Sequence, residues 1–277
     1  MGRGLFRSIW SLALIWGGLV AVPLAHAEHE GKLQILLLGD STTIGSVCRI
    51  TDPKGPHLED VVRELLATEK DLPPTQVINQ GRDGEYIHGL LKDGRYDREI
   101  AKLPGIDFVI IRYGLNDQAR REDFEQNFPK DFSALIARLR QDFPQATLIP
   151  MTVIPYLSPE RDALINRLVK QVGEAEKLPV FDIYPRYQAE LANGYNMLNY
   201  RRYPLEKIPE AHRAWLQPFV RNNSVVVMDQ RLDAHFRDLP GWFGDRHPNL
   251  AGYHVIGDET AKYLAPRIRE KLKLEKR

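Results

Sequence analysis

Apolar residues along this chain fall into short continuous runs, separated by longer stretches in which they recur at three- and four-residue intervals. A short apolar run that ends in polar or turn-forming residues is typical of a strand buried on both faces, as in a parallel sheet. Five such runs, the last of them short, are Leu33 to Leu38, Gln76 to Asn79, Phe108 to Tyr113, Thr147 to Val153 and Pro179 to Asp182.

The stretches between these runs have the periodicity of amphipathic helices. They are Leu58 to Thr68, Glu122 to Asp142 and Glu160 to Lys177, and a last one, Leu250 to Leu272, follows near the C-terminus. Strands that alternate with helices predict an α/β fold, in which helices cover both faces of a parallel sheet.

This alternation breaks down from about Pro185 to Pro240, where aromatic residues and prolines are frequent. Long irregular stretches inside a compact domain are usually functional or form an added subdomain. We therefore expect residues 28–277 to form a single domain with an insertion at about residues 185–240. The aromatic residues of the insertion are Tyr187, Tyr195, Tyr200, Tyr203 and Trp215, among others.

The N-terminus has the pattern of a secretory signal peptide. Arg3 and Arg7 precede an apolar run from Ile9 to Val22, and Ala25-His26-Ala27 supplies small residues at a cleavage site. The run is shorter than the roughly 20 apolar residues that cross a bilayer. The pattern predicts that residues 1–27 are removed and that the mature protein is exported to the periplasm or the extracellular space without a stable membrane anchor.

Charge and cysteine content narrow the possible partners. Removal of residues 1–27 takes away two of the 38 Lys and Arg residues, which leaves 36 against 37 acidic residues and a formal charge of −1. Nucleic-acid binding is not indicated, because it requires a basic excess or a basic stripe. Cys48 is the only cysteine, so the chain cannot form an internal disulfide.

Polar residues that follow strands are the first candidates for chemistry, because ligands of open parallel sheets bind at the carboxyl ends of the strands. Each segment alone is also a common turn, and a lone histidine before a helix is often structural. The candidate segments are Gly39-Asp40-Ser41, Asn79 to Glu85, Gly114 to Asp117 and Asp245 to Asn249.

Taken together and in this order, the four segments resemble the conserved blocks of the GDSL/SGNH hydrolase family over nearly all of residues 32–272. The resemblance implies a three-layer α/β/α, flavodoxin-like fold and acyl transfer through a serine nucleophile. Ser41 would attack the ester carbonyl and His247 would act as its general base.

The same resemblance implies an oxyanion hole made of the backbone N–H groups of Ser41 and Gly84 and the side-chain amide of Asn116. Gly84 is preferred to Gly81 because the family's oxyanion glycine lies five positions after the asparagine that Asn79 matches.

The third triad member departs from the family pattern. The acid usually lies three residues before the histidine, where this chain has Gly244, whereas Asp245 lies two before it. Asp245 is the expected acid, since a loop can shift by one residue and keep the contact. Asp233, Asp238, a backbone carbonyl or a Ser-His dyad are the alternatives.

Asp40 and Asp117 would also lie at this edge of the sheet, and a metal site is an alternative interpretation of these two carboxylates. The resemblance implies that both carboxylates have a structural role and hold loops in place. No His, Asp or Glu cluster elsewhere in the sequence has the spacing of metal ligands. We therefore expect neither a metal nor a cofactor.

The insertion is the element expected to choose the substrate. Its aromatic residues either fill a satellite core or form a platform for sugar rings, with a polar rim of Asn193, Asn196, Asn199, Arg201 and Arg202. This composition favours an O-acetyl ester of a carbohydrate, small or polymeric. The alternatives are a lysophospholipase or thioesterase, an acetyl transferase between sugars, and a silent glycan-binding relative. Oligomeric state is not indicated.

Overall fold

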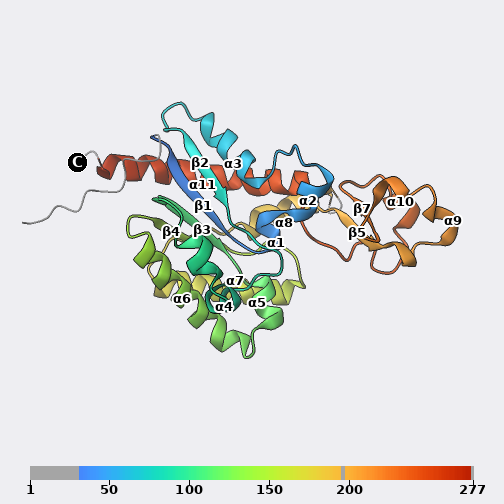
Figure 1. The fold of residues 1–277 in the computed structure, drawn as a ribbon, viewed down its shortest axis with the longest axis horizontal. Helices are drawn as coiled ribbons and strands as arrows, with labels where there is room; N and C mark the ends of the chain where they lie inside the picture. The colour runs from blue at the N-terminus through green and yellow to red at the C-terminus, as the bar shows by residue number, and fades with distance from the viewer. Residues whose placement is uncertain (1–30, 195–196, 276–277) are drawn as a thin grey trace, which may run out of the picture.

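The computed structural model describes residues 31–194 and 197–275, so the predicted signal peptide lies outside the described residues. Its centre is a parallel sheet in the order β2-β1-β3-β4 (Figure 1). The strands are β1 (Leu33–Gly39), β2 (Thr75–Asn79), β3 (Phe108–Arg112) and β4 (Thr147–Pro150). All four lie where the apolar runs predict them.

The fifth run forms less strand than expected. Phe181 makes a single parallel bridge with Met151, in which Thr152 N–H donates to the Phe181 carbonyl and Phe181 N–H donates to the Pro150 carbonyl. Pro150 and Pro179 both precede the bridged residues, and because proline has no N–H the ladder does not extend in that direction. β4 ends at Pro150, before the expected Val153.

Alternate residues of the central strands are buried in two separate cores. Leu36 and Leu38 of β1 face one core, and Ile35 and Leu37 face the other. This is the two-residue period of a strand buried on both faces.

Helices cover each of these cores, and the two layers are visible on opposite sides of the sheet in Figure 1. On one face lie α4 (Ile87–Lys92), α5 (Leu115–Arg120), α6 (Phe124–Asp142), α7 (Pro159–Ala175) and a π-helical turn, Tyr96–Ile100. On the other face lie α3 (Leu58–Ala67), α8 (Tyr184–Ala192) and α11 (Leu250–Glu275). The three-layer α/β/α prediction is confirmed.

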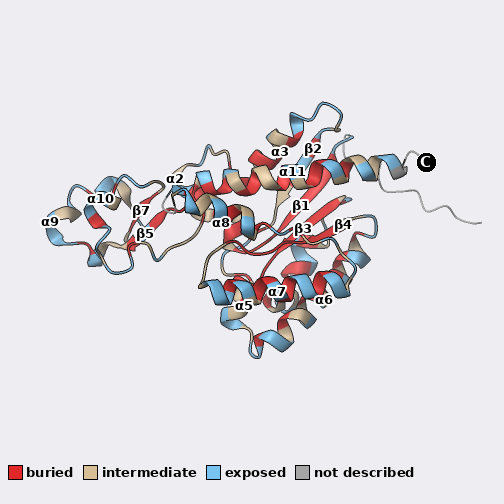
Figure 2. Ribbon diagram, turned by 180° about the vertical axis from the view of Figure 1, so that it is seen from behind, coloured by how far each residue is buried: buried red, intermediate tan, exposed pale blue. Residues whose placement is uncertain are grey.

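The insertion begins later than the sequence suggests. Pro185 to Ala192 belong to α8, and Tyr187 of this helix is buried in the core of the main domain. The irregular chain starts after α8, and residues 199–243 fold into a small unit that projects from the end of the sheet near α1 and α2 (Figures 1 and 2).

This insertion unit has its own antiparallel sheet and its own core. The sheet has the order β5-β7-β6, and Trp242, Phe236 and Tyr203 are the large residues buried beneath it. Its elements are β5 (Arg201–Pro204), α9 (Glu210–Arg213), β6 (Val220–Arg221), β7 (Ser224–Val227) and α10 (Asp233–Phe236), with 3₁₀ turns at Leu205–Lys207 and Gln217–Phe219.

Two short helices complete the fold at the carboxyl end of β1. They are α1 (Ser41–Ile44) and α2 (Ser46–Thr51), with Gly45 between them in the left-handed conformation. None of the helices in the described part of the chain is long and apolar enough to span a bilayer.

Candidate active site

Ser41 lies at a sharp turn between β1 and α1. A side chain on Gly39 would come within 2.2 Å of the Thr43 hydroxyl and 2.7 Å of the Arg112 carbonyl, so only glycine fits. Asp40 caps α1 by accepting from the Thr42 backbone N–H at 2.9 Å and from its hydroxyl at 2.7 Å. The turn therefore places Ser41 at the first helical position, where backbone N–H groups have no partner within the helix.

A chain of hydrogen bonds connects Ser41, His247 and Asp245. Ser41 Oγ lies 3.0 Å from His247 Nε2, and His247 Nδ1 lies 2.6 Å from Asp245 Oδ1. With the imidazole proton on Nδ1, the ring donates to the aspartate and its free Nε2 accepts from the serine. This arrangement can activate a serine as a nucleophile.

Asp245 reaches the histidine through a local turn. Its Oδ1 also accepts from the backbone N–H of His247, at 3.2 Å, so the carboxylate folds back over the one intervening residue. This geometry explains how an acid two residues before the histidine meets the imidazole. Asp233 is engaged elsewhere, since it pairs with Arg201 and accepts from Trp242 Nε1 at 2.8 Å.

Three residues that the sequence did not predict to lie beside the triad contact His247 or Asp245. Tyr200 stacks on the His247 ring, with centroids 5.6 Å apart and planes inclined by 17°, and the Tyr156 hydroxyl lies 3.1 Å from Nδ1 and 3.2 Å from Nε2. Arg202 Nε lies 3.0 Å from Asp245 Oδ2. Tyr156 could have been found, because it closely follows the run of β4, whereas the contacts of Tyr200 and Arg202 depend on how the insertion folds.

The expected oxyanion donors line the same pocket, which has a volume of about 260 Å³ and also holds Ser41 and His247. Gly84 has a φ of +69°, a conformation that favours glycine, and it lies on the pocket wall with Asn116. Gly81 instead packs under α1, where an added Cβ would lie 2.5 Å from Ile44 N, and its N–H donates to Asn79. Of the two glycines, Gly84 is therefore the one that lines the pocket with Ser41.

Asp40 and Asp117 fix backbone loops. Asp117 accepts from the N–H groups of Ile87 and Gly114 at 2.8 and 3.0 Å, which ties α4 to the loop before α5. Burial raises the pKa of Asp117 to about 7, and burial also raises the pKa of Asp40. Within the described ranges, no group of three His, Cys, Asp or Glu side chains is placed to hold a metal ion.

Cys48 is buried next to the loop that carries His247, where its thiol lies 3.6 Å from the Pro248 carbonyl. Desolvation raises the pKa of this thiol to about 12. The thiol is therefore protonated at neutral pH and does not compete with Ser41 as a nucleophile.

The expected polar rim of the insertion is only partly present. Arg201 and Asn199 are buried, and Arg201 forms an ion pair with Asp233, so neither contributes to a rim. Arg202 lines the catalytic pocket and Asn193 is exposed on the main domain, while Asn196 and Tyr195 lie outside the described residues. Most of the aromatic residues fill cores, and Trp215 is 43% exposed.

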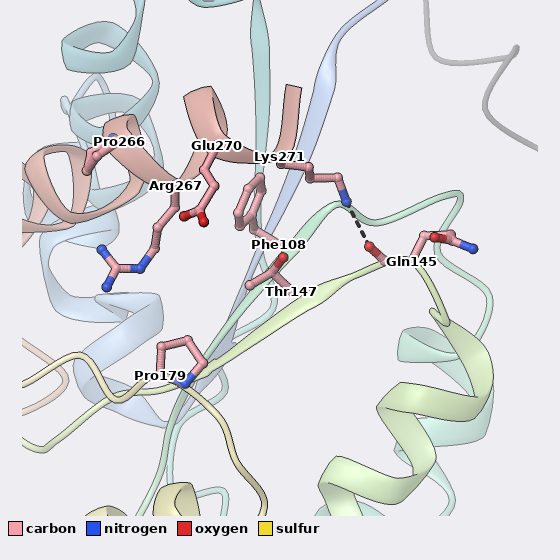
Figure 3. A pocket seen from close by; sticks show the side chains of 8 residues that line it. All are labelled: Phe108, Gln145, Thr147, Pro179, Pro266, Arg267, Glu270 and Lys271. Carbon is pink, nitrogen blue, oxygen red and sulfur yellow. Dashed lines mark hydrogen bonds between the residues drawn. The ribbon is translucent and has the colours of Figure 1, made fainter. Parts of the chain in front are cut away.

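A larger pocket of about 680 Å³ lies at the opposite end of the sheet (Figure 3). Phe108 and Thr147, at the amino ends of β3 and β4, form its floor, and α11 forms a wall from which Lys271 donates to the Gln145 carbonyl at 2.7 Å. Its lining contains neither Ser41 nor any histidine, so the smaller pocket is the catalytic candidate.

Comparisons with known proteins agree with the fold. A lipase/acylhydrolase from Enterococcus faecalis superposes with a TM-score of 0.50 at 19% identity, covering 85% of this chain and 96% of that one. An acetylxylan esterase from Geobacillus stearothermophilus gives 0.51 at 19% identity over 84% and 94%, and a further acetyl xylan esterase, AlAXEase, gives 0.52 at 17% over 84% and 100%. Identities this low show a shared fold.

A search of curated protein sequences found no match. The family itself is established by a sequence profile, which matches residues 37–201, more than half of the 277 residues. The chain therefore belongs to the GDSL-like lipase/acylhydrolase family, whose members are ester hydrolases.

Proposed function

We propose that this protein is an exported serine esterase that removes O-acetyl groups from a carbohydrate. The observation that carries the catalytic part is the hydrogen-bonded chain Ser41–His247–Asp245, which lies in one pocket with Gly84 and Asn116. Such an arrangement performs acyl transfer on unrelated folds, so its geometry is a better guide to chemistry than the fold.

The reaction follows from the positions of these groups. Ser41 Oγ attacks the carbonyl carbon as His247 Nε2 takes its proton, and Asp245 stabilises the imidazolium that forms. The negative charge on the carbonyl oxygen is stabilised by the N–H groups of Ser41 and Gly84 and by the Asn116 amide, each of which contributes about 3 kcal/mol. His247 then protonates the leaving alcohol, and water releases acetate from the acyl-serine with His247 as base.

The lining of the pocket favours a short acyl group. Tyr156, Tyr200 and Arg202 close one side, and Val47 is the only aliphatic side chain among the residues that line the pocket in the described part of the chain. A lipid-like acyl chain requires an apolar tunnel to bury its methylene groups. A lysophospholipase or thioesterase activity is therefore less well supported, and the acetylxylan esterases of similar fold support the sugar ester.

The other alternative is a catalytically inactive glycan-binding protein. The shifted position of Asp245, two residues before the histidine, favours this alternative. The contact between Asp245 and His247 argues against it, because Asp245 Oδ1 lies within hydrogen-bond distance of His247 Nδ1, as a triad acid would.

Export rests on residues 1–27 alone. If the proposal holds, expression of the full chain in a secreting bacterial host yields a mature protein that begins at Glu28, measured by intact mass. Recovery of the uncleaved chain in the cytoplasm would contradict export without affecting the esterase proposal.

The esterase proposal is tested by acetate release from 4-nitrophenyl acetate and from an acetylated polysaccharide, with 4-nitrophenyl octanoate as the long-chain comparison. The wild type should cleave both acetates and cleave the octanoate at least tenfold more slowly, and Ser41→Ala should abolish turnover. Ser133→Ala, on α6 away from the pocket, is the matched serine control. Faster cleavage of the octanoate would favour the lipid-like alternative.

A further inference from the structure

A second pocket adjoins the catalytic one. It has a volume of about 230 Å³, and the two pockets share Asp83 and Gly84, so the loop that carries the oxyanion glycine is the wall between them. The second pocket is lined by this loop, by α4 and by the last residue of α5. Both helices cover the same face of the sheet (Figure 1). A substrate whose ester lies at Ser41 would reach the second pocket by crossing the Asp83–Gly84 loop.

Four arginines and three carboxylates line this second pocket, and three of the arginines form no ion pair in the described part of the chain. Arg95 is buried and pairs with Glu85, their closest atoms being 2.7 Å apart. Arg82, Arg98 and Arg120 are exposed, and none of the three is within ion-pair distance of a carboxylate in residues 31–194 or 197–275.

The three acidic residues of the second pocket, Asp83, Glu85 and Asp93, offset only part of the charge of its four arginines, which leaves one positive charge in excess. Glu85 is already engaged by Arg95 and by the Tyr113 hydroxyl, which donates to it at 2.7 Å. Asp83 accepts from the Ser46 hydroxyl, at 2.5 Å, on the side of the catalytic pocket. Asp93 is the remaining carboxylate, and Arg98 contacts its backbone carbonyl at 2.9 Å.

Arg120 is the arginine of this pocket that lies next to Gly84, on the wall of the catalytic pocket. It follows Asn116 by one turn of α5, so both side chains lie on the same face of the helix. Its Nη2 lies 3.0 Å from the position that a Cβ on Gly84 would occupy. The Arg120 guanidinium, which has no hydrogen bond or ion pair with the described residues, thus lies beside Gly84, one of the expected oxyanion donors.

We propose that the second pocket binds the carboxylate of a uronic acid residue next to the acetylated sugar. The proposal rests on the carbohydrate esterase function and names the substrate class as an acidic glycan. Arginine presents two parallel N–H donors that match the two oxygens of a carboxylate, and such charge-assisted hydrogen bonds are strong. A neutral glycan has no anionic group to pair with the guanidinium groups of Arg82 and Arg120.

Binding to the inactive Ser41→Ala protein tests this site separately from catalysis. Titration calorimetry would compare trigalacturonate, which has no ester, with neutral xylotriose at low ionic strength. We expect trigalacturonate to bind at least tenfold more tightly, and the preference to shrink as salt screens the charges. Adding Arg120→Gln or Arg82→Gln should weaken trigalacturonate binding about tenfold.

Arg237→Gln is the matched control, because Arg237 is an exposed arginine at the end of α10 in the insertion. Equal affinity for the two trisaccharides would overturn the proposal. So would Arg120→Gln and Arg82→Gln variants that bind trigalacturonate as the Arg237→Gln protein does.

Turnover then distinguishes the two proposals. Wild-type enzyme should have a higher kcat/KM on acetylated oligogalacturonate than on acetylated xylo-oligosaccharide, and Arg120→Gln should reduce that ratio about tenfold. If trigalacturonate binds as expected but neither acetylated sugar is cleaved, the sugar-esterase function is wrong and the anion site stands.

Discussion

The positions of Ser41 and His247, the proposed nucleophile and base, depend on local features that can be read from the sequence. Gly39 permits the turn, Asp40 caps α1, and Pro248 follows the histidine directly. The acid was harder to identify, because its contact depends on how two residues of chain fold back on the imidazole. Short-range spacing predicts which residues are near one another, and the rotation of a side chain decides which atoms meet.

Asp245→Asn should lower kcat by about 10³- to 10⁴-fold on 4-nitrophenyl acetate, because an amide at this position no longer favours the proton on Nδ1. Initial rates with purified variants measure the effect. Asp238→Asn removes one of the alternative acids, on an exposed loop, and should leave kcat within about twofold of wild type. A full loss of activity in Asp238→Asn with an active Asp245→Asn would contradict the assignment.

Asp117 makes stability depend on pH. Its pKa is about 7 in the folded protein and about 3.8 when unfolded, so the native state binds more protons between these values. Stability from this group is fully present below pH 4 and is lost as pH rises through 7, by up to about 1.4 kcal/mol per pH unit.

Asp117→Asn removes this titration. Urea unfolding at pH 4, 5.5 and 7 should show the wild type losing free energy of unfolding relative to the variant as pH rises. Parallel pH profiles for the two proteins would show that Asp117 does not titrate in this range.

At the scale of elements, the period of apolar residues was sufficient to locate all four strands of the sheet and the main helices. It failed where prolines interrupt a ladder, at Pro150 and Pro179, and where α8 was assigned to the insertion. An aromatic and proline-rich composition does not distinguish a helix that packs on the sheet from an irregular loop. Tyr187 is buried because α8 packs on the sheet, and this contact cannot be read from composition.

Strand β5 links the insertion to the triad through Arg202. Its guanidinium pairs with Asp245 Oδ2, while Asp245 Oδ1 contacts His247 Nδ1. Arg202→Gln should reduce kcat on 4-nitrophenyl acetate about three- to tenfold, a modest effect because the side chain is 48% exposed and its charge is partly screened. Arg202→Lys keeps the charge and should recover part of the rate. Equal kcat values for wild type and both variants would show that this pair does not position the acid.

At the scale of the whole molecule, the candidate catalytic pocket is lined by residues of both the main domain and the insertion, which lie far apart in the sequence. The main domain supplies Ser41, Gly84, Asn116 and Tyr156. The insertion supplies Tyr200, which stacks on the His247 ring, and Arg202, which pairs with Asp245. Family blocks identify the first group, because it follows the strands. The second group could not be predicted, since residues 199–243 fold on their own core and their register against the His247 loop is a tertiary property.

The central claim is that Ser41 is a nucleophile activated by His247, and covalent labelling with a fluorophosphonate probe tests it most directly. Peptide mass spectrometry should find the phosphonyl adduct on Ser41 in the wild type and a rate of labelling at least a hundredfold lower in His247→Ala. Ser46 lines the same pocket and serves as the internal comparison. An adduct on Ser46, or labelling of Ser41 that does not depend on His247, would contradict the account.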